Sequence, residues 1–104
     1  GQLSLVLKVV ATNEAAELKG LAAEMVRKPG HLVVLLSESA PILIAIACSK
    51  DVSINAADVL DRLTKRFGGH GGGRPGFAQG GGLSGKMSEL VKAVRCELGV
   101  VSAE

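Results

Sequence analysis

A glycine-rich run in the second half of the chain holds the residues best suited to chemistry. Nine of the fourteen glycines lie within residues 68–82, in the sequence GGHGGGRPGFAQGGG. Glycine has no Cβ, so it lets the backbone approach a ligand closely, and successive N–H groups can then converge on an anion. Arg74 lies inside the run, and its guanidinium suits the forked geometry of a phosphate. These residue types predict a loop that contacts phosphate, with amides from Gly71, Gly72 and Gly73.

Two other interpretations of the run stay open at this point. Glycine also concentrates where backbones pack tightly, and glycine-rich segments also serve as flexible linkers. A linker is usually padded with serine and flanked by polar sequence, whereas this run contains Arg74, Pro75 and Phe77 and lies between two amphipathic segments. We therefore expect an ordered loop that contacts a ligand or another part of the backbone.

The run contains the glycine spacing of one nucleotide-binding motif in the wrong structural context, and an incomplete copy of a second motif. Residues 71–76 satisfy G-x-G-x-x-G, but a helix rather than a strand is expected before them, and Pro75 interrupts the segment. Residues 80–86 read G-x-x-x-x-G-K, but Met87 follows where a P-loop has the Ser or Thr that binds Mg²⁺. Both partial matches are attributed to the density of glycine.

Basic residues gather around the glycine run. Residues 62–95 contain seven basic residues and one acid, Glu89, whereas the rest of the chain has five basic residues and nine acids, for an overall charge of +2. Lys65 and Arg66 lie just before the run and Lys86 just after it. This asymmetry indicates a polyanionic partner, with a solvated basic helix face as the alternative.

The aromatic content limits how such a partner could be bound. The chain has no Trp, no Tyr and two Phe. Proteins that bind single-stranded nucleic acid, and RNA-recognition sheets, stack bases on exposed aromatic rings. We therefore expect contacts to the nucleic-acid backbone and to its shape.

No combination of titratable residues indicates an enzyme site. His70 lies within the run and could donate to a phosphate or cap a turn, while His31 is expected at a strand edge. Cys48 and Cys96 lack the spacing of zinc ligands or of a disulfide framework, so a reducing compartment fits best. No acid–base pair or activated nucleophile accompanies them. The isolated domain is not expected to be an enzyme, and no metal site is expected in it.

The first half of the chain predicts a strand, a helix and two buried strands. A β-branched stretch over residues 3–10 predicts the first strand. A helix follows, with Leu21 in its apolar stripe. Asn13 is expected to cap the start of this helix, and Pro-Gly at residues 29–30 is expected to end it. Apolar runs over 31–37 and 42–49 predict two strands buried on both faces.

The second half predicts a helix over 55–67, ended by Gly68, a short strand at 77–79 and a closing helix that is capped by Ser84 and ends at Gly99. The whole is expected to be an α/β fold, a two-layer sandwich with a mixed sheet, about three helices and the order β-α-β-β-α-β-α. Residues 1–104 form one domain, and because the chain begins Gly-Gln we expect it to be excised from a larger protein. Its apolar runs are shorter than the roughly 20 residues of a membrane span.

The string GGHGGGRPGFAQGGG resembles the C-terminal globular module of alanyl-tRNA synthetases, the DHH-associated domain, whose usual form is G-G-x-G-G-G-R-P-D-x-A-Q-x-G-G. The resemblance covers essentially the whole chain. The matching positions are Gly71, Gly72, Gly73, Arg74, Pro75, Ala78 and Gln79. Gly76 departs from the pattern, because Asp is usual there, which puts in doubt any turn-capping role of that residue.

The resemblance implies a non-catalytic module that binds the outer corner of tRNA, with tRNA(Ala) as the expected partner. It also implies that the module helps to link the other domains of the synthetase. It implies no cofactor here; the parent synthetase would use ATP and Mg²⁺, with Zn²⁺ in its editing domain. A cytoplasmic location is expected, with a mitochondrial one as the alternative, and no membrane partner. Together with the flanking cations, the predicted nucleic-acid-binding residues are Lys65, Arg66, His70, Gly71, Gly72, Gly73, Arg74, Gln79 and Lys86.

A rival assignment comes from a different class of protein. DHH-type phosphodiesterases, which degrade short RNA or single strands, share the same associated domain as their substrate-binding half. Their pattern has a His after the three glycines and a small residue at the position of Gln79. Arg74 and Gln79 favour the synthetase branch.

Overall fold

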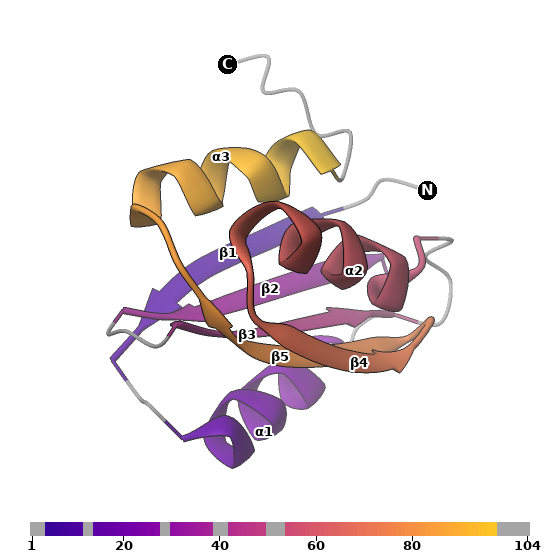
Figure 1. Ribbon diagram of the computed structural model, residues 1–104. Helices are drawn as coiled ribbons and strands as arrows, with labels where there is room; N and C mark the ends of the chain where they lie inside the picture. The colour runs from indigo at the N-terminus through magenta and orange to yellow at the C-terminus, as the bar shows by residue number, and fades with distance from the viewer. Residues whose placement is uncertain (1–3, 12–13, 28–29, 39–41, 50–53, 98–104) are drawn as a thin grey trace.

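The structure is a computed structural model that describes residues 4–11, 14–27, 30–38, 42–49 and 54–97. These residues form three helices and a five-stranded sheet with the strand order β1-β2-β3-β5-β4 (Figure 1). The first two strands in that order are parallel and every other neighbouring pair is antiparallel. The expected α/β sandwich with a mixed sheet and three helices is confirmed.

The first helix connects the two parallel strands. β1 (Ser4–Val10) pairs with β2 (His31–Ser37), and α1 (Ala15–Met25) runs between them. Leu18 of α1 is fully buried among residues of β2 and β3, but Leu21, which the sequence places in the apolar stripe, is 45% exposed. The expected cap at residue 13 and the stop at residue 29 lie outside the described residues.

The central strands form the hydrophobic core. β3 (Ile42–Cys48) pairs with β2 in antiparallel register, and side chains on both faces of the two strands are buried. An apolar strand of this kind needs cover on both sides, because either face would otherwise leave apolar surface in water. The predicted pair of doubly buried strands is confirmed.

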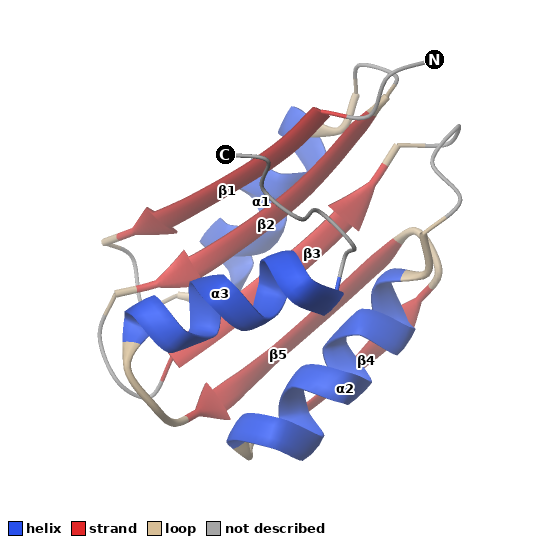
Figure 2. Ribbon diagram, turned by 90° about the horizontal axis from the view of Figure 1, so that it is seen from above, coloured by secondary structure: helices blue, strands red, loops and turns tan. Residues whose placement is uncertain are grey.

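Helices cover the sheet on both faces. α2 (Ala56–Phe67) and α3 (Met87–Glu97) pack on one face, and α1 packs on the other (Figures 1 and 2). The arrangement thus differs from a two-layer sandwich in having helices on both sides, for which the doubly buried strands give the reason. α2 begins as predicted, with the side chain of Asn55 accepting a hydrogen bond from the Asp58 amide at 3.2 Å, and it ends at Gly68, whose φ is 83°.

The glycine run itself forms two strands rather than one. β4 (His70–Arg74) and β5 (Phe77–Leu83) make an antiparallel hairpin, so one strand more is present than the sequence predicts. Sequence reasoning missed it because glycine is depleted in strands. Ser84 does not cap α3, which begins at Met87; its hydroxyl instead donates to the carbonyl of Phe67 at 2.8 Å.

The described residues lack two kinds of feature. None of the helices they form is long and apolar enough to cross a membrane. They also contain no group of three or more His, Cys, Asp or Glu side chains placed to hold a metal ion.

Candidate nucleic-acid interface

The glycine hairpin is tied to the rest of the domain at both ends. At its tip, the carbonyl of Pro75 accepts a hydrogen bond from the amide of Ala56, and the carbonyl of Gly76 accepts one from the amide of Cys48, both at 2.9 Å. At its base, the amide of Ser84 donates to the carbonyl of Phe67 at 3.0 Å. These bonds and the pairing of β5 with β3 exclude the linker interpretation.

One face of the hairpin is packed against α2, and this explains part of the glycine content. A Cβ on Gly71 would lie 2.5 Å from the carbonyl oxygen of Gln79 and 3.0 Å from a methyl of Leu60. A Cβ on Gly73 would lie 2.3 Å from the carbonyl oxygen of Phe77. Distances below 3.0 Å cannot be accommodated without a shift of the backbone. Tight packing therefore accounts for Gly71 and Gly73.

The opposite face of the hairpin is left open to a groove. Residues alternate between the two faces of a strand, so Gly72, which pairs with Gln79, and Arg74, which pairs with Phe77, lie on the α1 side. α1 packs on β2 and β3, and therefore leaves the outer part of the sheet uncovered. The groove between α1 and the hairpin has a volume of about 720 Å³ and is lined by Lys19, Ala23, Val26, Gly72, Gly73, Arg74, Gly76, Phe77 and Gln79.

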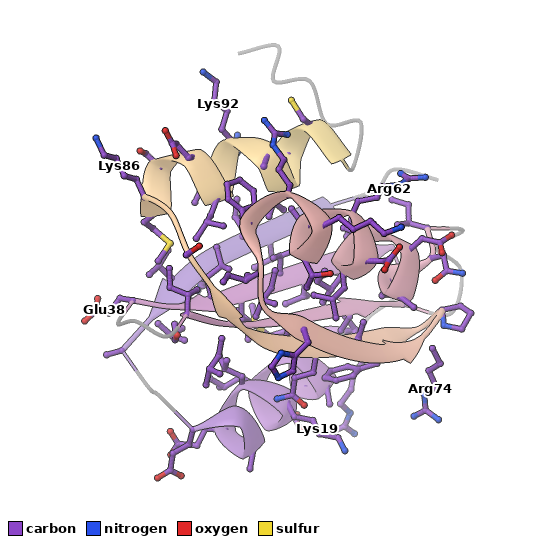
Figure 3. All side chains as sticks on the ribbon, in the orientation of Figure 1. Lys19, Glu38, Arg62, Arg74, Lys86 and Lys92 are labelled. Carbon is purple, nitrogen blue, oxygen red and sulfur yellow. The ribbon has the colours of Figure 1, made fainter. Side chains whose placement is uncertain are left out.

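The charged lining of this groove is entirely basic. Lys19 enters from α1 and Arg74 from the end of β4, and no carboxylate is among the lining residues (Figure 3). Both side chains are exposed, and neither forms an ion pair within the described part of the chain. A Cβ on Gly72 would meet no atom within 4 Å, so the floor of the groove at this glycine is bare backbone. The arrangement suits an anion that lies against the hairpin.

Lys19 could not be found from the sequence. It lies in an ordinary amphipathic helix more than fifty residues before Arg74, and nothing in its local sequence distinguishes it from a solvated lysine. Only the crossover from β1 through α1 to β2 places it beside the hairpin. We define the hairpin groove as Lys19, Gly72, Gly73, Arg74 and Gln79, together with the walls formed by α1 and Phe77.

The other predicted cations lie on the opposite side of the sheet. Lys65 and Arg66 belong to the last turn of α2, and Lys86 precedes α3. Figure 3 shows Lys86 at the α3 side of the sheet and Arg74 at the α1 side. The predicted binding residues therefore do not form one site. The exposed His70, on β4, is placed by strand alternation on the same side as Arg74, but it does not line the groove.

The cations on the α2 side are partly engaged within the domain. Lys65 forms an exposed ion pair with Asp61 at 3.1 Å, and the guanidinium of Arg66 lies 5.6 Å from the centre of the Phe67 ring. A second hollow, of about 550 Å³, lies between α2 and α3, and a carboxylate is among its lining residues Arg66, Phe67, Glu89, Lys92, Ala93 and Cys96. This hollow is electrostatically mixed, whereas the hairpin groove is uniformly basic.

Known proteins of related sequence carry the same domain within much longer chains. An alanine–tRNA ligase of Acidothermus cellulolyticus is 35% identical over 97 residues, covering 83% of this chain and 11% of its own length. The alanine–tRNA ligase of Methanoregula boonei is 40% identical over 67 residues, covering 64% of this chain and 7% of its own. The chain thus spans about a tenth or less of these relatives.

A solved structure agrees with the fold over nearly the full chain. The C-Ala domain from Aquifex aeolicus alanyl-tRNA synthetase superposes with a TM-score of 0.81 and 33% sequence identity, covering 94% of this chain and 93% of that one. The sequence profile of the DHHA1 domain matches residues 2–99. The resemblance inferred from the glycine run is therefore confirmed, and the chain belongs to the DHHA1 domain family.

Proposed function

We propose that this chain is the C-Ala-type domain of an alanine–tRNA ligase and that it binds tRNA without catalysing a reaction. The relatives named above are alanine–tRNA ligases, and the similar solved domain comes from an alanyl-tRNA synthetase. In this proposal the chain's partners are tRNA(Ala) and the other domains of the enzyme. ATP, Mg²⁺ and Zn²⁺ are used by those other domains.

The observation that carries the proposal is the uniformly basic lining of the hairpin groove. Two cations from different elements flank bare glycine backbone, with no carboxylate among the lining residues. A sugar-phosphate backbone presents the complementary charge, and a guanidinium can bind a phosphate through two parallel hydrogen bonds. The phenylalanines are only partly exposed, which favours contact with folded RNA over base stacking.

The predicted binding residues fall into two groups, those that line the groove and those that lie outside it. Arg74, Gly72, Gly73 and Gln79 line it, so they are proposed to touch RNA directly, together with Lys19. Gly71 supports the hairpin from its packed face. Lys65, Arg66, His70 and Lys86 stay predictions for contacts outside the groove, with the outer corner of tRNA as the proposed target.

The proposal is tested by comparing Arg74→Ala with Lys92→Ala. Both remove one exposed cation, but Lys92 lies on α3, on the opposite side of the sheet (Figure 3). We expect Arg74→Ala to weaken binding of a tRNA(Ala) transcript about tenfold, equivalent to ~1.4 kcal/mol, because a charge-assisted contact is lost. Lys92→Ala should change the affinity less than twofold. Fluorescence anisotropy measures both affinities, and thermal melts followed by circular dichroism check that both variants fold.

Two outcomes would contradict the proposal. One is equal binding by the two variants. The other is tighter binding of the unaltered domain to an unstructured oligonucleotide of the same length than to the tRNA transcript. Metal-dependent release of nucleotides that is lost in Arg74→Ala would instead favour the phosphodiesterase assignment.

A further inference from the structure

The free edge of the sheet at β4 presents backbone groups that no side chains surround. β4 lies at one end of the strand order and, within the described residues, pairs only with β5 (Figure 2). All five of its residues are exposed, and the middle three are glycines. Natural sheets protect their edge strands with charged side chains, proline or bulges, because unpaired N–H and C=O groups otherwise bind another molecule. The glycines leave the middle of this edge open.

The register of the hairpin determines which amides point to the free edge. Arg74 and Phe77 flank a two-residue turn, so they exchange backbone hydrogen bonds with each other. Because the direction alternates along a strand, Gly72 also bonds to β5, while Gly71 and Gly73 point their N–H and C=O groups outward. The edge therefore presents two amides about 6.7 Å apart, the length of two strand residues.

The two ends of β4 carry basic side chains on one face of the strand. Arg74 and His70 lie on this face about 13 Å apart, with Gly72 between them. Lys19 of α1 lines the groove on the same face, and β5, which reads FAQGGGL, carries no charged side chain. α2 packs on the opposite face, and its charged residues are Asp58, Asp61, Arg62, Lys65 and Arg66. The charged side chains that line the groove face of the hairpin are therefore all basic.

On the basis of the proposed function, which makes RNA the ligand of the hairpin groove, we propose that an RNA strand runs along the free edge of β4. Successive phosphates bind the amides of Gly73 and Gly71, and Arg74 and His70 hold the strand at the two ends. Successive phosphorus atoms of a nucleic-acid strand are separated by the same number of covalent bonds as Cα atoms two residues apart, so the spacing of the two amides suits them. The carbonyls of the same glycines accept hydrogen bonds from 2′-hydroxyls, which RNA has and DNA lacks.

His70 makes RNA binding along this edge sensitive to pH. Histidine is the side chain that ordinarily changes its charge between pH 5 and 8, and its charged form donates a stronger hydrogen bond to a phosphate. RNA therefore favours the protonated form of His70, and the affinity for RNA rises as the pH falls through this range. Arginine and lysine stay charged throughout it, so the contacts of Arg74 and Lys19 do not produce this dependence.

Hydrogen exchange, followed by NMR on the 104-residue chain, tests the position of the RNA strand. In the free domain, the outward amides of Gly71 and Gly73 should exchange quickly and the paired amide of Gly72 slowly. Saturation with a tRNA(Ala) transcript should slow exchange at Gly71 and Gly73 by about tenfold or more, as for amides that are occupied in most of the molecules. Gly72 is the internal control, because its amide is already bonded to β5 and should change little.

The pH dependence of affinity tests the contact of His70. Between pH 8 and pH 5.5, fluorescence anisotropy should show the affinity of the unaltered chain for the transcript rising about tenfold, as one charge-assisted contact allows. His70→Ala should remove the rise and stay weak, whereas His70→Lys should remove it and bind tightly at both pH values. His31→Gln is the matched control, because it replaces the other histidine of the chain, at the start of β2, and should keep the rise.

The two measurements together decide the proposal. Slower exchange at Gly71 and Gly73, with a rise in affinity that is lost in both His70 variants and kept in His31→Gln, supports it. Unchanged exchange at the two edge amides in the RNA-bound domain overturns it, and so does a rise in affinity that persists in His70→Ala. Neither of these failures contradicts RNA binding in the groove, which Arg74→Ala tests separately.

Discussion

Two neighbouring glycines of the hairpin are required for different reasons. Gly73 has the backbone of β5 at 2.3 Å from the place where a Cβ would stand, whereas Gly72 has no atom within 4 Å. The first is a requirement of packing and the second is compatible with close approach of a ligand. The packing interpretation of the run is therefore confirmed at Gly73, and the ligand-contact interpretation stays a prediction for Gly72.

This difference predicts opposite behaviour of two alanine variants. Gly73→Ala should lower the free energy of unfolding by about 1–3 kcal/mol, because the added methyl forces the hairpin strands apart. Gly72→Ala should leave stability within about 0.5 kcal/mol, yet weaken tRNA binding by obstructing the groove floor. Urea titration and fluorescence anisotropy measure the two effects. If Gly72→Ala binds tRNA normally, RNA does not approach the backbone at this residue.

The two cysteines should differ in reactivity and in their effect on pH dependence. Burial raises the pKa of the Cys48 thiol above its usual value of 9.0, whereas Cys96 is exposed. Above pH 9 the unfolded chain loses this proton more readily than the folded one, so stability should fall as the pH rises. We expect one thiol to react rapidly with a chromogenic disulfide and the second only on unfolding. Urea midpoints from pH 7 to 10 should fall less steeply for Cys48→Ala than for the unaltered chain.

At the scale of elements, the hairpin is positioned by the helix it packs against. The first amide of α2, on Ala56, has no partner within its own helix and donates instead to the carbonyl of Pro75 at the hairpin tip. The beginning of α2 therefore fixes the tip as well as the helix. Neighbouring Asn55 caps the same end.

Substitution of the cap residue Asn55 tests whether the start of α2 and the tip of the hairpin are stabilised together. Asn55→Ala should destabilise the domain by about 1 kcal/mol, because the amide of Asp58 loses its acceptor. Asn55→Asp keeps an acceptor and should restore most of that loss. Hydrogen exchange should show faster exchange at both Ala56 and the hairpin in the alanine variant. Faster exchange in α2 alone would mean that the tip is held independently.

Periodicity predicted most elements of the fold, because helical and doubly buried strand patterns are local. Asn55 and Gly68 marked the ends of α2 correctly for the same reason. The first strand of the hairpin, β4, could not be predicted, since the partner strand rather than residue preference keeps glycines 71–73 extended. The lining of the groove was anticipated only in part: Arg74 and Gln79 were named from the run as predicted contacts, whereas Lys19 reaches the groove through the topology.

At the scale of the whole molecule, the sheet separates the cations into two groups. Lys19 and Arg74 lie on the α1 side, while Arg66 and Lys92 lie on the side of α2 and α3. A concentration of positive charge in the sequence between residues 62 and 95 therefore does not correspond to one surface. RNA that enters the hairpin groove would meet the first group directly and the second only if it bent around an edge of the sheet.

This separation predicts how affinity depends on salt. For the unaltered domain, the logarithm of the tRNA association constant should fall linearly with the logarithm of salt concentration, with a slope set by the number of phosphates contacted. The double variant Lys19→Ala, Arg74→Ala should reduce the magnitude of that slope by about 1.4–1.8, because each lost phosphate contact contributes roughly 0.7–0.9. The matched double variant Lys92→Ala, Arg95→Ala removes the same charge from exposed positions of α3, neither of which is a predicted contact, and should change the slope much less. Titrations at four or more salt concentrations measure the three slopes, and equal reductions in the two double variants would show that RNA responds to net charge rather than to the hairpin groove.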